Sequence, residues 1–316
     1  MKIGFFGTPE IAAHALERLA ERFDIAFVVT GEDKPIGRHL HVQPCPAKAA
    51  ASARNIETLH PAKLRDEQFV SALRPHGADI FVVVAYGRLI PREVFAMPRL
   101  GTINLHPSLL PRYRGAAPVE WALIRGETET GVTVQLINDR LDAGDIVIQK
   151  KIPLDDAVTA GGLYKIVTPL GADMLVEAIE LLDSGKAAPV KQDESQATFC
   201  GKITAETAGI DWSRLSLEIH NLVRGLNPKP GASTGFREML VKIWTTAPFP
   251  EPPREPRAAG SLIVHQKKRL LAATGDGCVE ILTLQPERKK IMDALSFING
   301  YRLQPDSRFE PHTAAG

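Results

Sequence analysis

The chain has 316 residues, of which 44% are hydrophobic and 24% are charged, and its formal net charge is +1. This is ordinary globular composition, and the length exceeds what one hydrophobic core usually supports, so we expect two domains. The apolar run 80–85 is far too short to cross a bilayer, and residues 1–7 lead into Pro9 without the long apolar region of an export signal. These features argue against a membrane-spanning or exported protein and favour a cytoplasmic one.

The cysteines argue against a disulfide framework. Cys45, Cys200 and Cys278 are isolated and odd in number, so reduced structural thiols are expected. His39, His41 and Cys45 lie together in one short loop, but they lack the spacing of a usual metal site. We therefore expect no metal.

The first part of the chain alternates strand-like apolar runs with helix-like segments, which is typical of an α/β fold with a doubly wound, mostly parallel sheet. The expected strands are residues 3–6, 25–29, 80–85, 102–105 and 132–137. Gly4 and Gly7 beside the first strand invite a dinucleotide-binding interpretation. The chain there has no G-x-G-x-x-G motif, so NAD is the poorer hypothesis.

Two helices are expected in the same part. Pro118 and Gly126 stand at the start and just past the end of a short helix over 119–125. A longer helix over 163–182 carries a core-facing stripe at helical spacing, formed by Leu163, Ile166, Val167, Leu170, Met174, Ile179 and Leu182. After Gly185 the sequence becomes polar and loose, which predicts a first domain at 1–188, a linker at 189–205 and a second domain at 206–316.

The second domain combines helices with several short strands. Asp211-Trp212-Ser213 can cap a helix that reaches Leu226, and Gly275-Asp276-Gly277 can join two strands as a hairpin. The expected strands are residues 240–244, 261–265, 270–274 and 279–284, followed by a helix over 291–299. This set fits a small Greek-key barrel of the OB type. The proline-rich run 248–256 should be an extended surface loop, because prolines do not serve in central strands.

Two polar residues lie at the carboxyl end of one predicted strand of the first domain. Asn104 and His106 are two residues apart, so their side chains leave the same face of the strand. Pro107 disfavours the helical region for His106, which should stay extended at the carboxyl end of the strand. Ligands bind at that end in open α/β sheets.

An amide beside an imidazole suits acyl transfer to a nitrogen nucleophile, because both groups can donate to the anionic oxygen of a tetrahedral intermediate. Asp142, in the loop 141–145, can orient the imidazole and accept or relay the proton lost by the attacking amine. No Ser or Cys nucleophile is needed. Taken alone, an Asn-x-His pair at a strand end is more often structural, and the longer combination of motifs is what favours catalysis.

The string Asn104-Leu105-His106-Pro107-Ser108-Leu109-Leu110-Pro111, followed by Leu141-Asp142-Ala143-Gly144-Asp145, resembles the formyltransferases that use 10-formyltetrahydrofolate. Further segments narrow the likeness to the branch of that family that acts on initiator methionyl-tRNA: Gly7-Thr8-Pro9, Val84-Ala85-Tyr86-Gly87, residues 112–118 and residues 129–133. The resemblance runs nearly end to end. It implies a formyltransferase-type, Rossmann-like catalytic domain followed by an OB-like barrel that binds tRNA.

The resemblance also implies roles for single residues. Asn104, His106 and Asp142 match the catalytic set of the family, and the folate pocket would be formed by Ser108, Leu109, Leu110, Pro111, Tyr86 and Gly87. From the residues alone, the Ser-Leu-Leu-Pro segment is as suitable for covering a hydrophobic turn as for holding a pterin ring. The implied reaction transfers a formyl group from the co-substrate 10-formyltetrahydrofolate to the α-amine of methionine on initiator methionyl-tRNA.

Basic residues gather in the second domain, where residues 200–316 carry 16 Lys and Arg against 12 Asp and Glu. Arg288, Lys289 and Lys290 immediately precede the expected helix over 291–299, and cations at a helix amino terminus oppose its macrodipole. Together with Lys267 and Lys268 they make a phosphate backbone a reasonable partner. A solubilising surface explains them equally well without the resemblance, which implies tRNA.

One loop departs from the family pattern. The family is typically richer in Lys and Arg after the Gly-Arg pair of this loop, whereas here Lys34-Pro35-Ile36-Gly37-Arg38 is followed by His39-Leu40-His41. Lys34 and Arg38 are predicted tRNA contacts. The two histidines can gain charge beside phosphates.

Three alternatives stay open. A formyltransferase acting on a small amine, such as an amino sugar nucleotide, would use the same site, but the second domain and its basic segments count against it. Hydrolysis of formyltetrahydrofolate would use the same three residues with water as the nucleophile. The intact Asn, His and Asp set argues against an RNA-binding protein without enzymatic activity.

Overall fold

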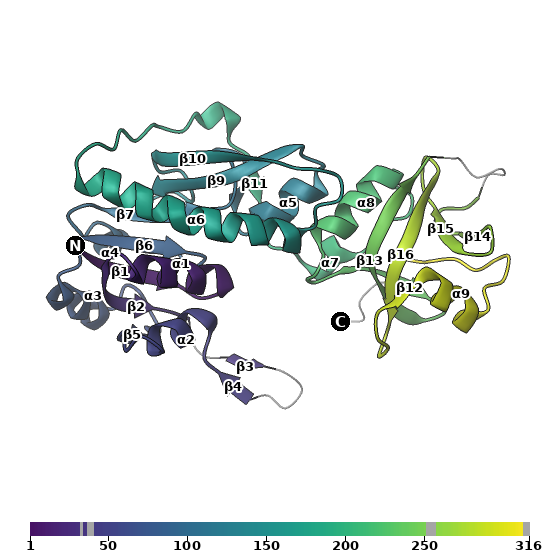
Figure 1. The fold of residues 1–316 in the computed structure, drawn as a ribbon, viewed down its shortest axis with the longest axis horizontal. Coiled ribbons are helices and arrows are strands. Elements are labelled where there is room, and N and C mark those ends of the chain that lie inside the picture. The colour runs from purple at the N-terminus through teal and green to yellow at the C-terminus, as the bar shows by residue number, and fades with distance from the viewer. Residues whose placement is uncertain (32–33, 37–40, 251–256, 312–316) are drawn as a thin grey trace. The chain divides into compact units, whose positions relative to one another are not determined.

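The computed structural model describes residues 1–31, 34–36, 41–250 and 257–311. They form two compact units (Figure 1): one holds residues 1–118, 129–153 and 164–200, and the other holds residues 119–128, 154–163 and the chain from 201 onward. The domain boundaries expected from the sequence stay a prediction. Among the described residues, every helix is too short or too polar to cross a lipid bilayer.

The first unit is built on a seven-stranded sheet with the strand order β10-β9-β7-β6-β1-β2-β5. Five strands run parallel: β1 (Lys2–Gly7), β2 (Asp24–Val29), β5 (Thr58–Leu59), β6 (Ile80–Val84) and β7 (Thr102–His106). At one edge the sheet continues in antiparallel fashion with β9 (Glu129–Leu136) and β10 (Ile146–Pro153). The predicted α/β class and the predicted strands are confirmed. Strand β10 was not predicted, because Gln149-Lys150-Lys151 interrupts its apolar residues.

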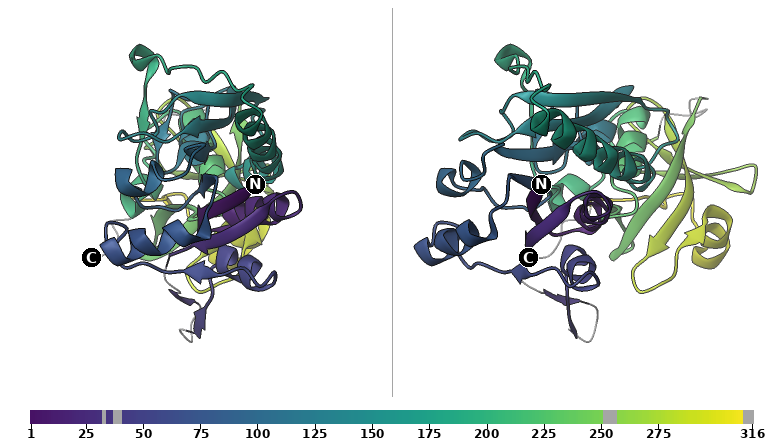
Figure 2. Two further views of the ribbon diagram at one scale, coloured as in Figure 1. Left: turned by 90° about the vertical axis from the view of Figure 1, so that its left-hand side faces the viewer. Right: turned by 60° about the vertical axis from the view of Figure 1, so that its left-hand side comes forward.

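Helices α1 (Glu10–Ala20) and α6 (Ala160–Asp183) lie together on one face of this sheet (Figure 2). An ion pair joins them, because Arg18 of α1 lies 2.7 Å from Asp173 of α6. Leu105 of β7 points to this face, because a Cβ atom added at Gly171 of α6 would lie 2.7 Å from its side chain. The predicted long helix is confirmed, although Ile166 of its predicted core stripe is 46% exposed.

Shorter elements complete the first unit: β3 (Lys34–Ile36), β4 (His41–Gln43), α2 (Pro46–Ser52), α3 (Glu67–Leu73), the 3-10 helix η1 (Arg74–His76), α4 (Arg92–Phe95), β8 (Arg114–Gly115), the 3-10 helix η2 (Glu194–Gln196) and β11 (Phe199–Cys200). We call residues 190–200 the strap. Its first residue, Val190, bridges to Ile146, and its last two form β11, which pairs in parallel with β8. The sequence analysis assigned the strap to the linker, whereas these pairings tie it into the first unit.

The second unit is an antiparallel barrel with helices around it. Its sheet has the order β12-β13-β16-β15-β14, with β17 also pairing with β16. The extended segment 308–310 closes the barrel, because it bridges Gly235 of β12 and also Ser261 beside β14. The elements are α5 (Pro118–Ile124), α7 (Ala205–Ala208), α8 (Ser216–Gly225), β12 (Ala232–Phe236), β13 (Met239–Phe249), β14 (Leu262–His265), β15 (Arg269–Ala273), β16 (Cys278–Pro286), β17 (Met292–Asp293) and α9 (Ala294–Tyr301).

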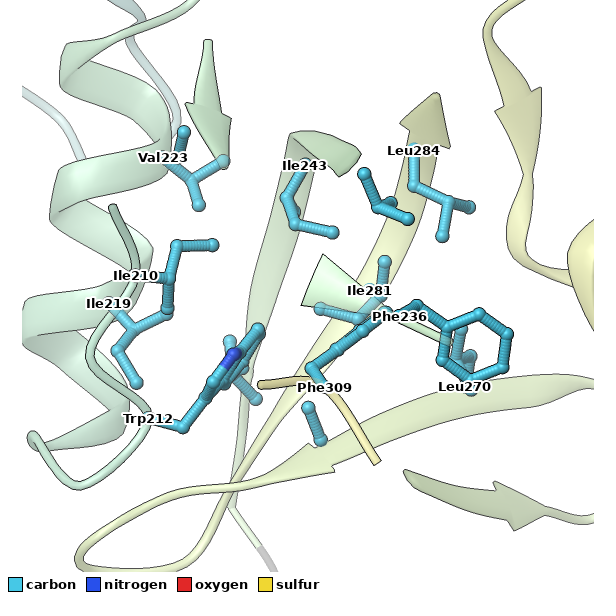
Figure 3. Packing of buried hydrophobic residues seen from close by; sticks show 14 of the residues in the cluster. Ile210, Trp212, Ile219, Val223, Phe236, Ile243, Leu270, Ile281, Leu284 and Phe309 are labelled. Carbon is cyan, nitrogen blue, oxygen red and sulfur yellow. The ribbon is translucent and has the colours of Figure 1, made fainter. Parts of the chain in front are cut away.

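Apolar side chains fill the barrel (Figure 3). Trp212 stacks on Phe309 with ring centroids 5.2 Å apart, and Phe236 packs edge to face against Phe297 at 5.3 Å. The four predicted strands, the hairpin at 275–277 and the barrel itself are confirmed. Strand β12 was not predicted, because Gly235 interrupts its strand pattern.

The predicted starts of two helices in the second unit were wrong. Asp211 turns the chain by accepting from Ser213, and α8 begins only at Ser216, whose N–H donates to Asp276 at 2.7 Å. The last helix begins at Ala294, not at residue 291, and Asp293 caps it by accepting from the N–H of Ser296. The expected opposition between Arg288–Lys290 and a helix dipole is therefore absent, because β17 and the Asp293 carboxylate intervene.

The proline-rich run is only partly a loop. Pro248 and Phe249 belong to β13, and Pro248 pairs with Val279 of β16, so the predicted loop was wrong at these two residues. This proline is tolerated because β12 pairs with β13 only as far as Ile243. Residues 251–256 of the run lie outside the described residues.

Candidate active site

Strand β7 carries two of the predicted site residues. Asn104 pairs with Gln135 of β9, and His106 pairs with Thr133, so all four side chains share one face of the sheet. This is the face opposite Leu105, away from α1 and α6. Alternation along β7 therefore separates an apolar, helix-covered face from one that carries polar groups.

The loop after β9 folds back and brings the third predicted residue to this pair. Asp142 Oδ1 lies 3.4 Å from Asn104 Nδ2, and Asp142 Oδ2 lies 3.8 Å from His106 Nδ1. The side chain of His106 is 5% exposed and that of Asp142 is 12% exposed. The amide, the imidazole and the carboxylate thus converge from segments that are far apart in the sequence.

The orientation of the His106 ring follows from its second nitrogen. His106 Nε2 lies 2.8 Å from the carbonyl oxygen of Tyr113. A carbonyl oxygen can only accept, so Nε2 carries a hydrogen and donates it. Nδ1 is consequently the nitrogen that faces Asp142.

The Asp142 carboxylate also accepts hydrogen bonds from a backbone N–H and from a side-chain amide. Oδ2 accepts from the N–H of Gly115 at 2.9 Å, and Oδ1 accepts from Gln135 Nε2 at 3.3 Å. Asp142 itself adopts the left-handed region with φ of 48°, which is uncommon outside glycine. Two residues on, a Cβ atom at Gly144 would lie 1.6 Å from the carbonyl oxygen of Leu136, so the loop presses against β9 where no side chain fits.

Four groups around Asp142 were missed in the sequence analysis. Gln135 is 1% exposed and stands among the apolar residues of β9, and this buried polar position was the one available signal. Gly115 and Arg114 were noticed only as part of the family resemblance. Gln192 lies in the polar run of the strap, where nothing local distinguishes it, and its Nε2 lies 2.9 Å from the carbonyl oxygen of Asp142.

The predicted folate segment, residues 108–111, is tied to the same edge of the sheet. Ser108 is fully buried and its carbonyl accepts from Thr133 Oγ1 at 2.7 Å. Leu110 is 3% exposed, and its carbonyl accepts from Gln149 Nε2 at 2.9 Å. Leu109 packs on β9, because a Cβ atom at Gly131 would lie 2.4 Å from its Cδ2. The segment is therefore anchored directly beside His106.

Tyr86 and Gly87, the other predicted folate residues, follow β6. The Tyr86 ring packs edge to face against Phe6 at 5.8 Å, and burial raises the pKa of its hydroxyl. Within the described part of the chain this buried hydroxyl has no hydrogen-bond partner. Gly87 is exposed with φ of 79°, and Leu89 just after it is 78% exposed.

The predicted tRNA contacts of the second unit lie in two exposed turns. Lys267 and Lys268 are in the β14–β15 turn, and the group Arg288, Lys289 and Lys290 is in the β16–β17 turn. Because β15 and β16 are antiparallel, both turns leave the same end of the sheet. A hollow of about 230 Å³ beside the second turn is lined by Leu240, Lys242, Gln285, Pro286, Glu287 and Arg288.

The predicted contacts in the first unit are less fully described. Lys34 lies in β3, and Arg38, His39 and Leu40 lie outside the described residues. His39 was also one of the three residues considered as metal ligands. Within the described ranges, no group of three or more His, Cys, Asp or Glu side chains could hold a metal ion.

Comparison with known proteins identifies the family. A family model described as "Formyl transferase" matches residues 1–179, and one described as "Formyl transferase, C-terminal domain" matches residues 202–302. A protein of Symbiobacterium thermophilum named methionyl-tRNA formyltransferase is 38% identical over 99% of this chain and 97% of its own length. A protein of the same name from Acidobacterium capsulatum is 40% identical over 98% of this chain and 99% of its own length.

Solved structures share the fold. HypX from Aquifex aeolicus in complex with tetrahydrofolic acid matches with a TM-score of 0.64 at 20% identity, covering 95% of this chain and 47% of that one. WlaRD, a sugar 3N-formyl transferase, matches with a TM-score of 0.65 at 21% identity, covering 92% of this chain and 99% of that one. The structural likeness shows the fold alone, whereas the sequence identities extend over nearly the whole chain. The chain belongs to the methionyl-tRNA formyltransferase family.

Proposed function

We propose that this chain transfers a formyl group from 10-formyltetrahydrofolate to the α-amine of methionine on initiator methionyl-tRNA, with Asn104, His106 and Asp142 as its catalytic residues. The observation that supports these three roles is their convergence, at 3.4 Å and 3.8 Å from the two carboxylate oxygens, on the polar face of β7. Membership of the family supports the substrate pair. The cytoplasm, expected from the sequence, is the compartment we assign to this reaction.

In this mechanism Asn104 stabilises charge. When the methionine amine adds to the formyl carbon, a C–N bond forms and the formyl oxygen becomes anionic. Asn104 Nδ2 donates to that oxygen in exchange for its 3.4 Å contact with Asp142, which is long for a hydrogen bond and easily given up. Such a donor typically contributes about 10²- to 10³-fold to the rate.

His106 and Asp142 handle the proton. Because Nε2 is bound to the Tyr113 carbonyl, only Nδ1 of the ring can exchange a proton with the reacting groups. Asp142 faces that nitrogen and can take up the proton that the attacking amine loses. The bond between the formyl carbon and the folate nitrogen then breaks, and the same proton passes to that nitrogen, so that the charges balance.

The folate pocket is proposed at residues 108–111 with Tyr86 and Gly87. Two observations support it. The 108–111 segment begins two residues after His106, and Leu89 and Leu141, which lie close in sequence to Gly87 and Asp142, are 78% and 49% exposed. Exposed apolar side chains of this kind suit a planar aromatic ligand. The buried Tyr86 hydroxyl, lacking a partner in the described ranges, can meet a polar edge of the same ligand.

Contacts to tRNA are proposed at Lys34 and Arg38 in the first unit and at Lys267, Lys268, Arg288, Lys289 and Lys290 in the second. The five residues of the second unit are exposed, and their two turns leave the same end of the barrel. Lysine and arginine side chains at such positions contact phosphates and fix the register of the nucleic acid rather than read its bases. Arg288 contributes less charge than its neighbours, because Glu287 lies 3.4 Å away.

The test uses the full chain with formyl donor and either charged initiator or charged elongator methionyl-tRNA. We expect formyl-methionine on the initiator tRNA and little on the elongator. Release of tetrahydrofolate at the same rate without tRNA would favour the hydrolase alternative. Faster transfer to an amino sugar nucleotide than to tRNA would favour the small-amine alternative.

A further inference from the structure

We propose that Gln192 of the strap is a positioning residue, which holds Asp142 in its reactive orientation without touching substrate. The inference rests on the proposed function, because it assigns Gln192 a part in the same reaction. It adds that the strap supports the active site without contacting substrate, through side chains that follow the catalytic sheet in the sequence.

One face of the Gln192 side chain holds the backbone of the Asp142 loop. Its Nε2 lies 2.9 Å from the carbonyl oxygen of Asp142 and 2.7 Å from that of Gly144. The same nitrogen lies 3.0 Å from Gln135 Oε1, and Gln135 donates its own amide hydrogen to the Asp142 carboxylate. A single amide group therefore fixes both the loop backbone and a direct partner of the catalytic carboxylate.

The other face of Gln192 is fixed by Arg114. Gln192 Oε1 accepts from Arg114 Nε at 3.1 Å and from Nη2 at 2.8 Å. Arg114 is 3% exposed, and its remaining guanidinium hydrogens form a two-point pair with Glu194 at 3.0 Å and 3.1 Å. That pairing holds the pKa of Glu194 below its ordinary value. Because the oxygen of Gln192 accepts from the guanidinium of Arg114, its NH2 group must point at the Asp142 loop.

The strap also holds the residue that donates to the carboxylate itself. Gly115 gives its N–H to Asp142 Oδ2 from strand β8, which pairs with residues 199–200 of the strap. A Cβ atom at Gly115 would lie 2.1 Å from the carbonyl oxygen of Cys200, so the two strands are in close backbone contact. Backbone and carboxylate of Asp142 are thus both fixed from the strap.

This support matters because Asp142 has an unfavourable backbone conformation. A left-handed non-glycine residue costs about 1 kcal/mol or more, and it persists only where its surroundings enforce it. Without the amide of Gln192, the two carbonyl oxygens at residues 142 and 144 lose a buried donor. The loop can then relax, and the carboxylate moves away from His106.

The test compares Gln192→Glu with Gln196→Glu in the full chain. The glutamate at 192 keeps the size and the oxygen that faces Arg114, but it replaces the donating NH2 by a second acceptor. Gln196 is exposed in the same strap and receives the same change of charge. We expect kcat to fall by about 10²-fold in Gln192→Glu, since a displacement near 1 Å can have that effect, with KM for both substrates close to that of Gln196→Glu.

A double substitution separates positioning from a general structural role. In an Asp142→Asn background, Gln192→Glu should lower kcat by less than about 3-fold, because the group through which it acts is already gone. If the wild-type protein transfers the formyl group, two results would overturn the inference. One is that the effects of Asp142→Asn and Gln192→Glu on kcat multiply, and the other is that Gln192→Glu and Gln196→Glu are equally active. Wild-type protein without formyl transfer would instead overturn the proposed function. If Gln192→Glu does not fold, Gln192→Ala provides the same comparison without the added charge.

Discussion

The candidate active site of the first unit and the barrel core of the second unit are stabilised by different kinds of interaction. Around Asp142 the first unit uses hydrogen bonds between segments distant in sequence, with donors from Gly115, Gln135 and Gln192. The barrel of the second unit is filled by aromatic and aliphatic side chains such as Phe236 and Phe309. Hydrogen bonds are directional and hydrophobic burial is not, so the first arrangement fixes angles and the second fixes volume.

This difference separates the effects of substitution. At the site, exchange of one polar group should change the rate far more than the free energy of unfolding. In the barrel, loss of apolar volume should change the free energy of unfolding far more than the rate. Four substitutions test this contrast, in order of decreasing expected effect.

Replacing the carboxylate should have the largest effect. We expect Asp142→Ala to lower kcat by about 10³- to 10⁴-fold, because proton transfer and the orientation of His106 are lost together, while the affinity for folate stays unchanged. Steady-state kinetics and a folate-binding titration measure the two quantities. Asp139→Ala, in the same loop but paired with Arg92 at the surface, is the control. Normal turnover of Asp142→Ala would end the proposed mechanism.

In the barrel, Phe309→Ala removes a ring that is 1% exposed and stacked on Trp212. The cavity should lower the free energy of unfolding by about 3–5 kcal/mol, measured by urea denaturation of the full chain. Ile291→Ala, at a position 56% exposed in the same unit, should change it by less than about 1 kcal/mol. Equal losses in the two variants would show that segment 308–310 does not hold the barrel closed.

Gly144→Ala tests whether the Asp142 loop is fixed by its backbone. The added methyl group would meet the Leu136 carbonyl at 1.6 Å, so the loop must shift. We expect kcat to fall by about 10²-fold and the free energy of unfolding by about 1–3 kcal/mol. Gly201→Ala, where nothing lies within 4 Å of the added atom, should change neither quantity. An active Gly144→Ala protein would mean that the loop tolerates displacement.

The smallest effect is expected at the proposed tRNA surface. Lys289→Ala should raise KM for initiator tRNA a few-fold and reduce the slope of log affinity against log salt by about 1, since one phosphate contact is lost. Lys186→Ala, an exposed lysine of the first unit, serves as the control. An unchanged salt slope would indicate that the basic turns only keep the protein soluble.

Local patterns in the sequence predicted much of the fold and the centre of the site. Apolar runs located β1, β2, β6, β7 and β9, and the two-residue spacing of Asn104 and His106 put both on one face of β7. What failed depended on distant partners. The N–H of Ser216, the first residue of α8, donates to Asp276, 60 positions later, and no local pattern near residue 211 could reveal that partner.

The contacts of the strap were not predicted for the same reason. Its polar run indicates a linker until Arg114 and Asp142, 78 and 50 positions away from Gln192, are known to lie against it. A short polar segment is predicted to be solvent-exposed when its hydrogen-bond partners lie far away in the sequence. Burial of Gln135 in β9 was the one local sign that a hydrogen-bonded network lies behind the site.

The position of the strap in the chain has a consequence for exchanging parts between related enzymes. A chimaera joined at residue 188 would take Gln192 and Glu194 from one parent and Arg114 and Asp142 from the other. A junction after Cys200 keeps every one of these side chains in a single parent, because β11 ends there. A chimaera should therefore retain full catalytic speed only when the crossover falls on the far side of β11.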